Sequence, residues 1–370
     1  MTRIAVWTVV AVALLANVAI AADLNVAVVG PITGQYAAFG EQMKRGAAQA
    51  VEDINAKGGV LGRKLNLLVG DDACDPKQAV NEANRMANND VKFVDGHYCS
   101  GSSIPASAVY ADNGILEISP ASTNPSFTDD AKAKGWNNVF RVCGRDDAQG
   151  RVAGKFIVEH YKGKPVAILH DKSPYGKGLA DETKKAINAA GMKEAMYEAT
   201  TADDKDFSAL ISKMKQANIA LIYLGGYHTE AGLIVRQAHE QGLNAPLLSG
   251  DALATDEFWT ITGAAGEGSM MTFPPEPRNL PTAKDVVAEF KKQGYEPEGY
   301  TLFTYAAMQV YAAAVAAAKS DKLDDVSKVM HAGKFDTVIG TVGFDPKGDV
   351  VGPDYVVYAW HNGKREEMKR

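Results

Sequence analysis

From residue 24 onward, short runs of apolar and β-branched residues alternate with longer segments in which apolar residues recur every three or four positions. The segment after the first run places Met43, Ala47, Ala50 and Ile54 at helical spacing and ends at a pair of glycines. This alternation of strand and helix predicts an α/β fold with parallel sheets. The predicted strands lie in DLNVAVVGP, KLNLLVGDDAC, VKFVDGHY, GILEISP, KPVAILHD, IALIYLGG and APLLSGD.

Two later helices have clear signals. Asp75 can cap a helix that has Pro76 at its first position and Gln78 three residues after the cap, as a capping box requires. After residue 270 the alternation resumes with an alanine-rich helix around Thr304 to Ala318. We therefore expect a chain of two lobes that crosses between them more than once.

The N-terminus places Arg3 before an apolar run from Ile4 to Ala16 and a small-residue site that ends at Ala21. This pattern predicts a secretory signal peptide over residues 1–21 and a periplasmic protein. An uncleaved membrane anchor is the alternative, but the run is short for a bilayer span. Cleavage would leave 38 basic and 45 acidic residues, a net charge of −7. Such a charge argues against nucleic acid or an anionic membrane as the main partner.

Cysteines occur at positions 74, 99 and 143. Cys74 and Cys99 each follow a predicted strand, and export into an oxidising compartment favours a disulfide between them. That bond would add about 3.5 kcal/mol on the chain-entropy estimate. A zinc site is the weaker alternative, because no CxxC or paired histidine accompanies the cysteines. Cys143 is interpreted as a buried, inert thiol.

In open α/β sheets, ligands bind beyond the carboxyl ends of the strands. Those ends are rich in hydroxyls, tyrosines and glycines here, in GPITGQYAAFG, GHYCSGSS, SPASTNP, HDKSPYGKG, GGYHTE and SGDALATDE. Ser100 lies where a strand gives way to a helix, so its hydroxyl and nearby amides could bind an anion. Ser102 and Ser103 are interpreted as helix caps. Such loops suit a small polar ligand held by neutral donors.

Four further strand ends carry candidate groups. Thr123 could donate from its hydroxyl and its amide, although a plain loop explains it equally well. Asp251 could face a ligand cation or cap the next turn, for which Asp256 is better placed. Tyr175 and Tyr227 would supply flat amphipathic surfaces at equivalent strand ends, or they belong to the core or its rim.

Catalytic and metal motifs have little support in the sequence. No GxSxG, P-loop or HExxH motif occurs, and no GxGxxG follows the first strand. Asp71 and Asp72 are adjacent, so along a strand they point to opposite faces and make a poor metal site. We therefore expect a protein that is not an enzyme and needs neither a cofactor nor a metal.

A set of segments resembles the leucine/isoleucine/valine-binding proteins of bacterial ABC importers, over about Asp23 to Trp360. The likeness is carried by NVAVVGPITG, GAAQAVEDINAKGGVLGRKL, DDACDPKQAV, GHYCSGSSIPAS, ISPAST, HDKSPYGKGLA, KDFSALISKMK and GGYHTEAGLIVRQA. The resemblance implies a type I periplasmic binding protein, with two doubly wound α/β lobes joined by three crossovers and a ligand cleft between them. We place lobe 1 in residues 22–142 and 271–350, and lobe 2 in residues 143–270 and 351–370. The resemblance also implies the Cys74–Cys99 disulfide.

The resemblance further implies how an amino acid is held. Ser100 and Thr123 would bind its α-carboxylate through hydroxyls and amides. Its ammonium would meet the Ala121 carbonyl and Asp251. Tyr227 would lie close by, and Tyr175 would contact the ligand from the second lobe.

Departures from the family pattern bear on the choice of ligand. The leucine-type pattern has glutamate where Asp251 stands, leucine where Tyr98 stands, and a second alanine where Ser122 stands. Tyr300 and Phe39 match the side-chain pocket of the family. A ring at position 98 should shrink that pocket, which predicts compact ligands such as alanine, valine, proline or γ-aminobutyrate.

The resulting prediction is a monomeric binding component that delivers an amino acid to a permease in the inner membrane. The alternative is a periplasmic amino-acid or amide sensor that signals through a receptor or regulator. One sequence does not separate these two, because they differ in the partner that reads the closed state.

Overall fold

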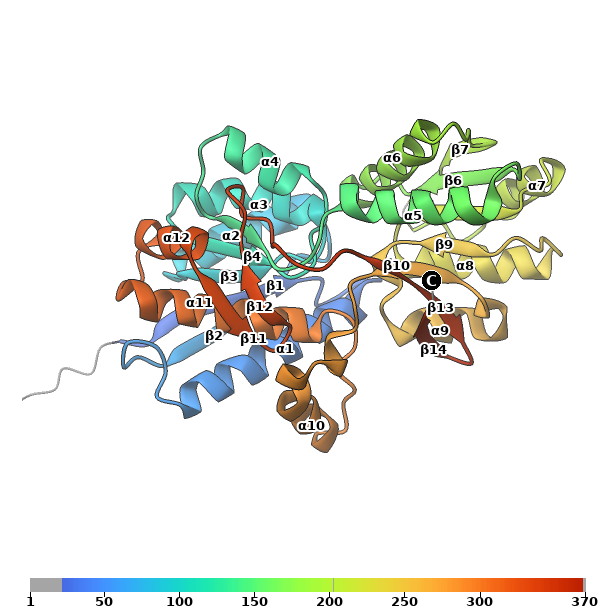
Figure 1. The fold of residues 1–370 in the computed structure, drawn as a ribbon. Coiled ribbons are helices and arrows are strands. Elements are labelled where there is room, and N and C mark those ends of the chain that lie inside the picture. The colour runs from blue at the N-terminus through green and yellow to red at the C-terminus, as the bar shows by residue number, and fades with distance from the viewer. Residues whose placement is uncertain (1–21, 202, 369–370) are drawn as a thin grey trace, which may run out of the picture.

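The computed structural model describes residues 22–201 and 203–368, so the predicted signal peptide lies outside the described residues. Two separate sheets form the centres of two lobes that lie side by side (Figure 1). The strands are β1 (Leu24–Gly30), β2 (Leu65–Asp71), β3 (Phe93–Gly96), β4 (Leu116–Ser119), β5 (Val139–Arg141), β6 (Val166–His170), β7 (Met196–Ala199), β8 (Leu221–Gly225), β9 (Leu247–Ser249), β10 (Met270–Phe273), β11 (Lys334–Thr337), β12 (Gly340–Gly343), β13 (Val356–His361) and β14 (Lys364–Glu367).

Helices follow most of these strands and cover the sheets. The α-helices are α1 (Ala37–Ala56), α2 (Pro76–Asn88), α3 (Ser100–Asp112), α4 (Ser126–Ala133), α5 (Asp146–Tyr161), α6 (Pro174–Ala189), α7 (Ser208–Gln216), α8 (His228–Glu240), α9 (Asp256–Thr262), α10 (Lys284–Lys292), α11 (Thr301–Ala318) and α12 (Leu323–Ala332). Short 3₁₀ turns are η1 (Asp251–Leu253), η2 (Gly263–Gly266), η3 (Pro277–Asn279) and η4 (Pro281–Ala283). The predicted α/β alternation is therefore confirmed.

Both sheets have a doubly wound core of parallel strands. The smaller sheet has the order β2-β1-β3-β4-β5, and all its pairs are parallel. The larger sheet has the order β14-β13-β10-β9-β8-β6-β7, in which β13 and β14 pair antiparallel. In each sheet the order reverses beside the first strand, between β1 and β3 and between β6 and β8. Ligands of such sheets bind where the order reverses, at the carboxyl ends of the strands.

The chain passes between the two sheets three times. It leaves the smaller sheet after β5, returns after β10, and crosses again between β12 and β13, as the red segment of Figure 1 shows. The expected boundary at residue 271 falls inside β10, which pairs with β13 as far as Phe273. The second crossing therefore begins after that strand.

Local signals account for the helices that frame the site. Met43, Ala47 and Ala50 of α1 are fully buried, as their spacing predicts. The Asp75 carboxylate accepts bonds from the amides of Lys77 and Gln78 at the start of α2. The Gln78 side chain donates to the Asp71 carbonyl. Asp75 thus caps α2, but Gln78 ties the helix to β2 instead of closing the expected capping box.

Helix α11 is a core helix. Within the described residues it is the one helix long and apolar enough to cross a membrane, but 67% of it is buried inside the protein. It packs against α1 and contacts β3 and β4. This packing explains its alanines, because small side chains let two helices and a sheet approach closely.

Candidate ligand-binding site

The carboxyl ends of β3 and β4 bring two of the predicted polar residues together. Ser100 is the first residue of α3, and its Oγ accepts a bond of 3.2 Å from the Asn124 amide. Thr123, in the loop after β4, is fully buried, and its Oγ1 has no hydrogen-bond partner among the described residues. A buried hydroxyl without a partner is costly, so this group is suited to a ligand oxygen.

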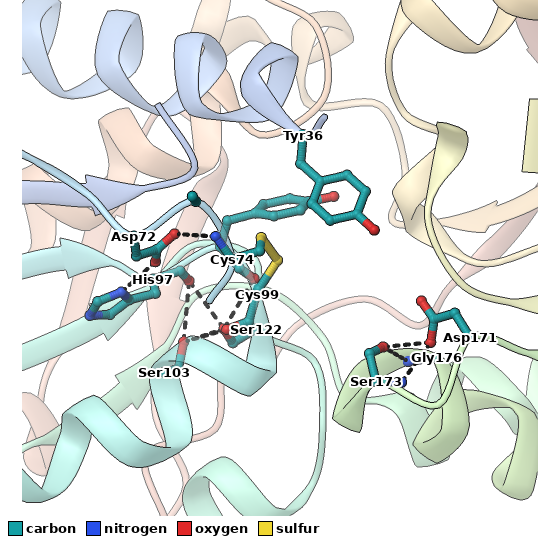
Figure 2. The surroundings of a disulfide bond; sticks show 12 residues. Tyr36, Asp72, Cys74, His97, Cys99, Ser103, Ser122, Asp171, Ser173 and Gly176 are labelled. Atoms are coloured by element: carbon teal, nitrogen blue, oxygen red, sulfur yellow. Dashed lines mark hydrogen bonds and ion pairs between the residues drawn. A yellow bond between two sulfur atoms is a disulfide. The ribbon is translucent and has the colours of Figure 1, made fainter. Parts of the chain in front are cut away.

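The serines around this point mainly support the backbone. Ser122 donates its amide to Ser119 Oγ at 2.8 Å, and its hydroxyl lies 3.1 Å from the His97 and Tyr98 carbonyls. Ser103 Oγ contacts Ser122 Oγ and lies 3.4 Å from the Cys99 carbonyl (Figure 2). The polar groups of Ser122 are therefore engaged inside the lobe, where they hold the loop after β4 against α3.

The prediction that Ser102 or Ser103 caps α3 is wrong. The helix begins earlier than the sequence suggested, so Cys99 occupies the cap position and makes no side-chain cap bond. The Ser103 hydroxyl instead contacts the Ser122 hydroxyl of the loop after β4. Ser102 Oγ has no partner within the described part of the chain.

A disulfide fixes the start of α3. Cys74, after β2, and Cys99, before α3, are bonded with their Cα atoms 5.5 Å apart. The predicted pairing is thus confirmed, and Cys143 is a buried free thiol whose pKa is raised by burial. Figure 2 shows the bond near the start of α3, with Asp171 and Ser173 from the loop before α6 on the opposite side.

Asp251 lies at the centre of a second polar group. It is 2% exposed, and its Oδ1 accepts a 2.7 Å bond from the Tyr175 hydroxyl and a 3.1 Å bond from Gln149 Nε2. The Tyr300 hydroxyl donates to Oδ2. Burial raises the pKa of Asp251, and these donors oppose that shift. A carboxylate held by neutral donors retains its charge for a cation.

Aromatic rings fill the space beside Asp251. Phe39 and Tyr98 are stacked at 4.4 Å between ring centroids, and Tyr98 meets Tyr300 edge-on at 5.6 Å. The ring centroid of Tyr227 lies 5.1 Å from that of Tyr175 and 6.1 Å from that of Tyr98. Burial, followed by the Asp251 charge, raises the pKa of Tyr98, Tyr175 and Tyr300. Their hydroxyls therefore stay protonated and act as donors.

The two lobes touch across this site. Asn124 Nδ2 donates to the Pro174 carbonyl at 2.6 Å, and Thr229 Oγ1 donates to the Gln35 carbonyl at 3.3 Å. The rings of Tyr36 and Tyr227 are 4.3 Å apart. These contacts join loops of the two lobes, so the structure is a closed form.

The ten predicted contact residues are all at most 6% exposed; they are Phe39, Tyr98, Ser100, Ala121, Ser122, Thr123, Tyr175, Tyr227, Asp251 and Tyr300. Eight of them follow strand ends, whereas Phe39 lies in α1 and Tyr300 lies just before α11. Sequence reasoning missed others. Gln149 lies in α5 and Tyr36 just before α1. Arg141 donates to the Ser122 carbonyl at 2.7 Å and to the Asn124 carbonyl at 3.0 Å. The one sequence signal for Arg141 is that it is a lone basic residue at the end of a strand.

The adjacent carboxylates Asp71 and Asp72 have structural partners. Asp71 accepts bonds from the Ile32 and Thr33 amides, and Asp72 contacts His97 Nδ1 at 2.6 Å. Within residues 22–201 and 203–368 no three histidine, cysteine or acidic side chains gather as metal ligands would.

Comparison with known proteins decides the family. A family profile described as periplasmic binding protein matches residues 23–365. The chain belongs to the periplasmic binding protein family. A family relative from Brucella suis, named Leu/Ile/Val-binding protein homolog 1, is 50% identical over 92% of this chain and 91% of its own length. Another, from Pseudomonas aeruginosa, is named leucine-, isoleucine-, valine-, threonine-, and alanine-binding protein; it is 43% identical over 97% of this chain and 96% of its own length.

Solved structures of family members agree with the fold. A leucine binding protein from Thermotoga maritima superposes with a TM-score of 0.85 at 28% identity, over 94% of this chain and 98% of its own. A branched-chain amino acid transporter substrate binding protein from Streptococcus pneumoniae, in complex with isoleucine, gives 0.83 at 26% identity, over 94% and 100%. The expected type I periplasmic binding protein fold is therefore confirmed.

Proposed function

We propose that this chain is the periplasmic substrate-binding component of an ABC importer, acts as a monomer, and delivers a compact aliphatic amino acid to a membrane permease. The ligands proposed are alanine, valine, proline and γ-aminobutyrate. The names of the relatives, which mention leucine, isoleucine, valine, threonine and alanine, support an aliphatic amino acid.

The observation that carries this proposal is the pairing of two opposite polar sites in one closed cleft. Ser100 offers a hydroxyl at the start of α3, where the helix N-terminus favours a carboxylate, and Thr123 offers one from the loop after β4. Asp251, buried and held by tyrosine donors, is suited to an ammonium. An amino acid is a small molecule that carries both charges. Its binding would stabilise the closed form by its greater affinity for that form.

The rings beside Asp251 support a limit on ligand size. Tyr98 stacks on Phe39 and meets Tyr300, whose hydroxyl is bonded to Asp251. Tyr300 cannot turn away without losing that bond, and Tyr98 cannot turn without unstacking. Extra methylenes forced into such a pocket cost about 1–3 kcal/mol. Leucine and isoleucine should therefore bind less tightly than smaller ligands.

Isothermal calorimetry on refolded, ligand-free protein lacking residues 1–21 tests the proposal. The panel is leucine, isoleucine, valine, alanine, proline and γ-aminobutyrate. We expect tight binding of at least one compact ligand and weak binding of leucine. Leucine binding at least tenfold tighter than valine and proline would overturn the size limit, and no heat from any ligand would overturn the amino-acid function.

A further inference from the structure

One amide joins two buried carboxyl groups in the cleft. Gln149 Nε2 lies 3.2 Å from Asp146 Oδ1 and 3.1 Å from Asp251 Oδ1. Gln149 Oε1 accepts bonds from the Asp251 amide at 2.8 Å and from Thr272 Oγ1 at 2.6 Å. Because the oxygen is used by these two donors, the Gln149 NH₂ group is directed to the carboxyls. Two acidic groups thus share the donor beside a site for one ammonium.

The two carboxyls have unequal surroundings. Asp251 receives bonds from Tyr175, Tyr300 and Gln149. Asp146 is fully buried, and its Oδ2 has no hydrogen-bond partner among the described residues. An ionised carboxylate needs donors when it is removed from water. Asp251 is therefore the better place for a negative charge.

Thr123 lies directly beside Asp146. The Asp146 amide donates to the Thr123 carbonyl at 2.9 Å, and the Thr123 hydroxyl adjoins the Asp146 carboxyl. Thr123 Oγ1 and Asp146 Oδ2 are both buried, and neither has a partner in the part of the chain that the structure describes. A single proton placed between these two oxygens would satisfy both.

The groups that face Asp146 do not supply a compensating charge. Arg141 approaches it, but the Arg141 guanidinium is paired with Asp349 at 2.8 Å. The other titratable neighbours are Asp251, the Cys143 thiol and the phenols Tyr175, Tyr223, Tyr227 and Tyr355. Burial, then the Asp251 charge, raises the pKa of Asp146 well above its usual range, although the adjoining Thr123 hydroxyl, the Arg141 charge and the Gln149 amide oppose that shift. The N-terminus of α5 favours an anion and opposes this, but that effect is smaller than burial.

We propose that Asp146 carries a proton in the closed form and acts as a positioning residue for Thr123. The proton comes from the solvent and is held on Oδ2, which then donates to Thr123 Oγ1. The Thr123 hydroxyl hydrogen is left free to donate to the ligand carboxylate. Asp251 remains the one negative charge that meets the ligand ammonium. This inference rests on the proposed amino-acid function.

A direct test is the carboxyl ¹³C resonance of Asp146 in protein labelled at aspartate carboxyls and saturated with L-valine at pH 7. The Asp146→Asn variant assigns the signal, because its resonance is then missing. We expect the chemical shift of a protonated carboxyl. The shift of an ionised carboxylate in protein that binds valine would overturn the inference and leave the proposed function standing. Absence of valine binding in the same sample would count against the proposed function itself.

Calorimetry on variants supplies a second readout. We expect Asp146→Asn, whose amide can donate to Thr123, to bind L-valine at least tenfold more tightly than Asp146→Ala. The control is Asp147→Asn, because Asp147 is on the same helix but pairs with Arg145; its affinity should match that of the wild type. Equally weak binding of valine by Asp146→Asn and Asp146→Ala would overturn the inference. A second test uses 2,4-diaminobutyrate, whose extra ammonium an ionised Asp146 would attract. If the wild type binds it more tightly than valine, Asp146 is ionised and the inference fails.

Discussion

Tyr300 and Asp251 meet across the boundary between the two lobes. Tyr300 precedes α11, which packs on the smaller sheet, whereas Asp251 follows β9 of the larger sheet. The Tyr300 hydroxyl donates to Asp251 Oδ2, and Tyr175 of the second lobe donates to Oδ1. The carboxylate therefore receives donors from both lobes when the cleft is closed, so the proposed ammonium site is complete in the closed form.

Tyr300→Phe removes one donor and keeps the ring. A hydrogen bond to a charged group contributes about 1.5–3 kcal/mol, so ligand affinity should fall roughly 10- to 150-fold. The ratio of valine to leucine affinity should not change, because the pocket keeps its shape. Calorimetry measures both. Tyr305→Phe is the matched control, because Tyr305 lies on α11 and donates to Asp53 of α1, within lobe 1; equal losses in the two variants would contradict the account.

Asn124 links ligand binding to closure. Its backbone amide donates to Ser100 Oγ, beside the proposed carboxylate site, and its side chain donates to the Pro174 carbonyl of the other lobe. Asn124→Ala should weaken ligand affinity roughly 2- to 12-fold, the value of one neutral hydrogen bond of about 0.5–1.5 kcal/mol. The loss should appear as faster ligand dissociation in stopped-flow measurements.

Asn137→Ala is the control for this variant, because its side chain donates to Asp324 within lobe 1. A dissociation rate that is the same in Asn124→Ala as in the wild type would show that the Asn124–Pro174 bond does not hold the lobes together.

The disulfide should stabilise the protein by about 3.5 kcal/mol through the chain entropy of the unfolded state. The double variant Cys74→Ser/Cys99→Ser should lose that free energy of unfolding in urea denaturation. Dithiothreitol should lower the stability of the wild type by the same amount and leave the double variant unchanged. Cys143 cannot produce such an effect because it is already a free thiol. Equal free energies of unfolding for the oxidised and the reduced wild type would show that the disulfide does not stabilise the protein.

Asp171 makes the stability depend on pH. Burial raises its pKa to about 6, and its Oδ2 has no partner among the described residues. The native state therefore binds the proton more tightly than the unfolded chain, whose aspartate titrates near pH 4. The stability contributed by protonated Asp171 is complete below pH 4 and is lost as pH rises through about 6, by about 3 kcal/mol at most.

Urea denaturation of Asp171→Asn across pH 4 to 7 measures this loss. Relative to the wild type, the variant should gain stability as pH rises. Asp206→Asn should differ from the wild type by a nearly constant amount over this range, because hydrogen bonds from Ser208 lower the pKa of Asp206 and its titration falls below about pH 4. A constant difference between Asp171→Asn and wild type over the whole range would contradict the raised pKa.

The sequence predicted the parts of the site that depend on local pattern. Ser100, Thr123 and Asp251 follow buried strands, and the carboxyl ends of parallel strands face one region, so a search of strand ends selects them as candidates. It did not find Gln149 or Asp146. Both lie in α5. Gln149 contacts Asp251, 102 residues later in the chain, and Asp146 is linked to Asp251 through Gln149.

Some elements were also beyond local reasoning. The antiparallel pair β13 and β14 lies at the edge of a largely parallel sheet. These residues form strands because β13 pairs with β10, which is distant in the sequence. Strand β5 has only three residues and ends in Arg141, so it lacks the apolar run that marks the equally short β9. The start of α3 was misplaced because Ser102 and Ser103 each fit a cap, whereas Cys99 occupies the cap position.

The central claim is that rings beside Asp251 select compact amino acids, and the ratio of leucine to valine dissociation constants in wild type and Tyr98→Leu tests it most directly. Relief of an overpacking cost of about 1–3 kcal/mol should shift that ratio roughly 5- to 150-fold toward leucine. Tyr98→Phe, which keeps the ring, should leave the ratio unchanged. A wild type that already prefers leucine at least tenfold, or a Tyr98→Leu variant with an unaltered ratio, would contradict the account.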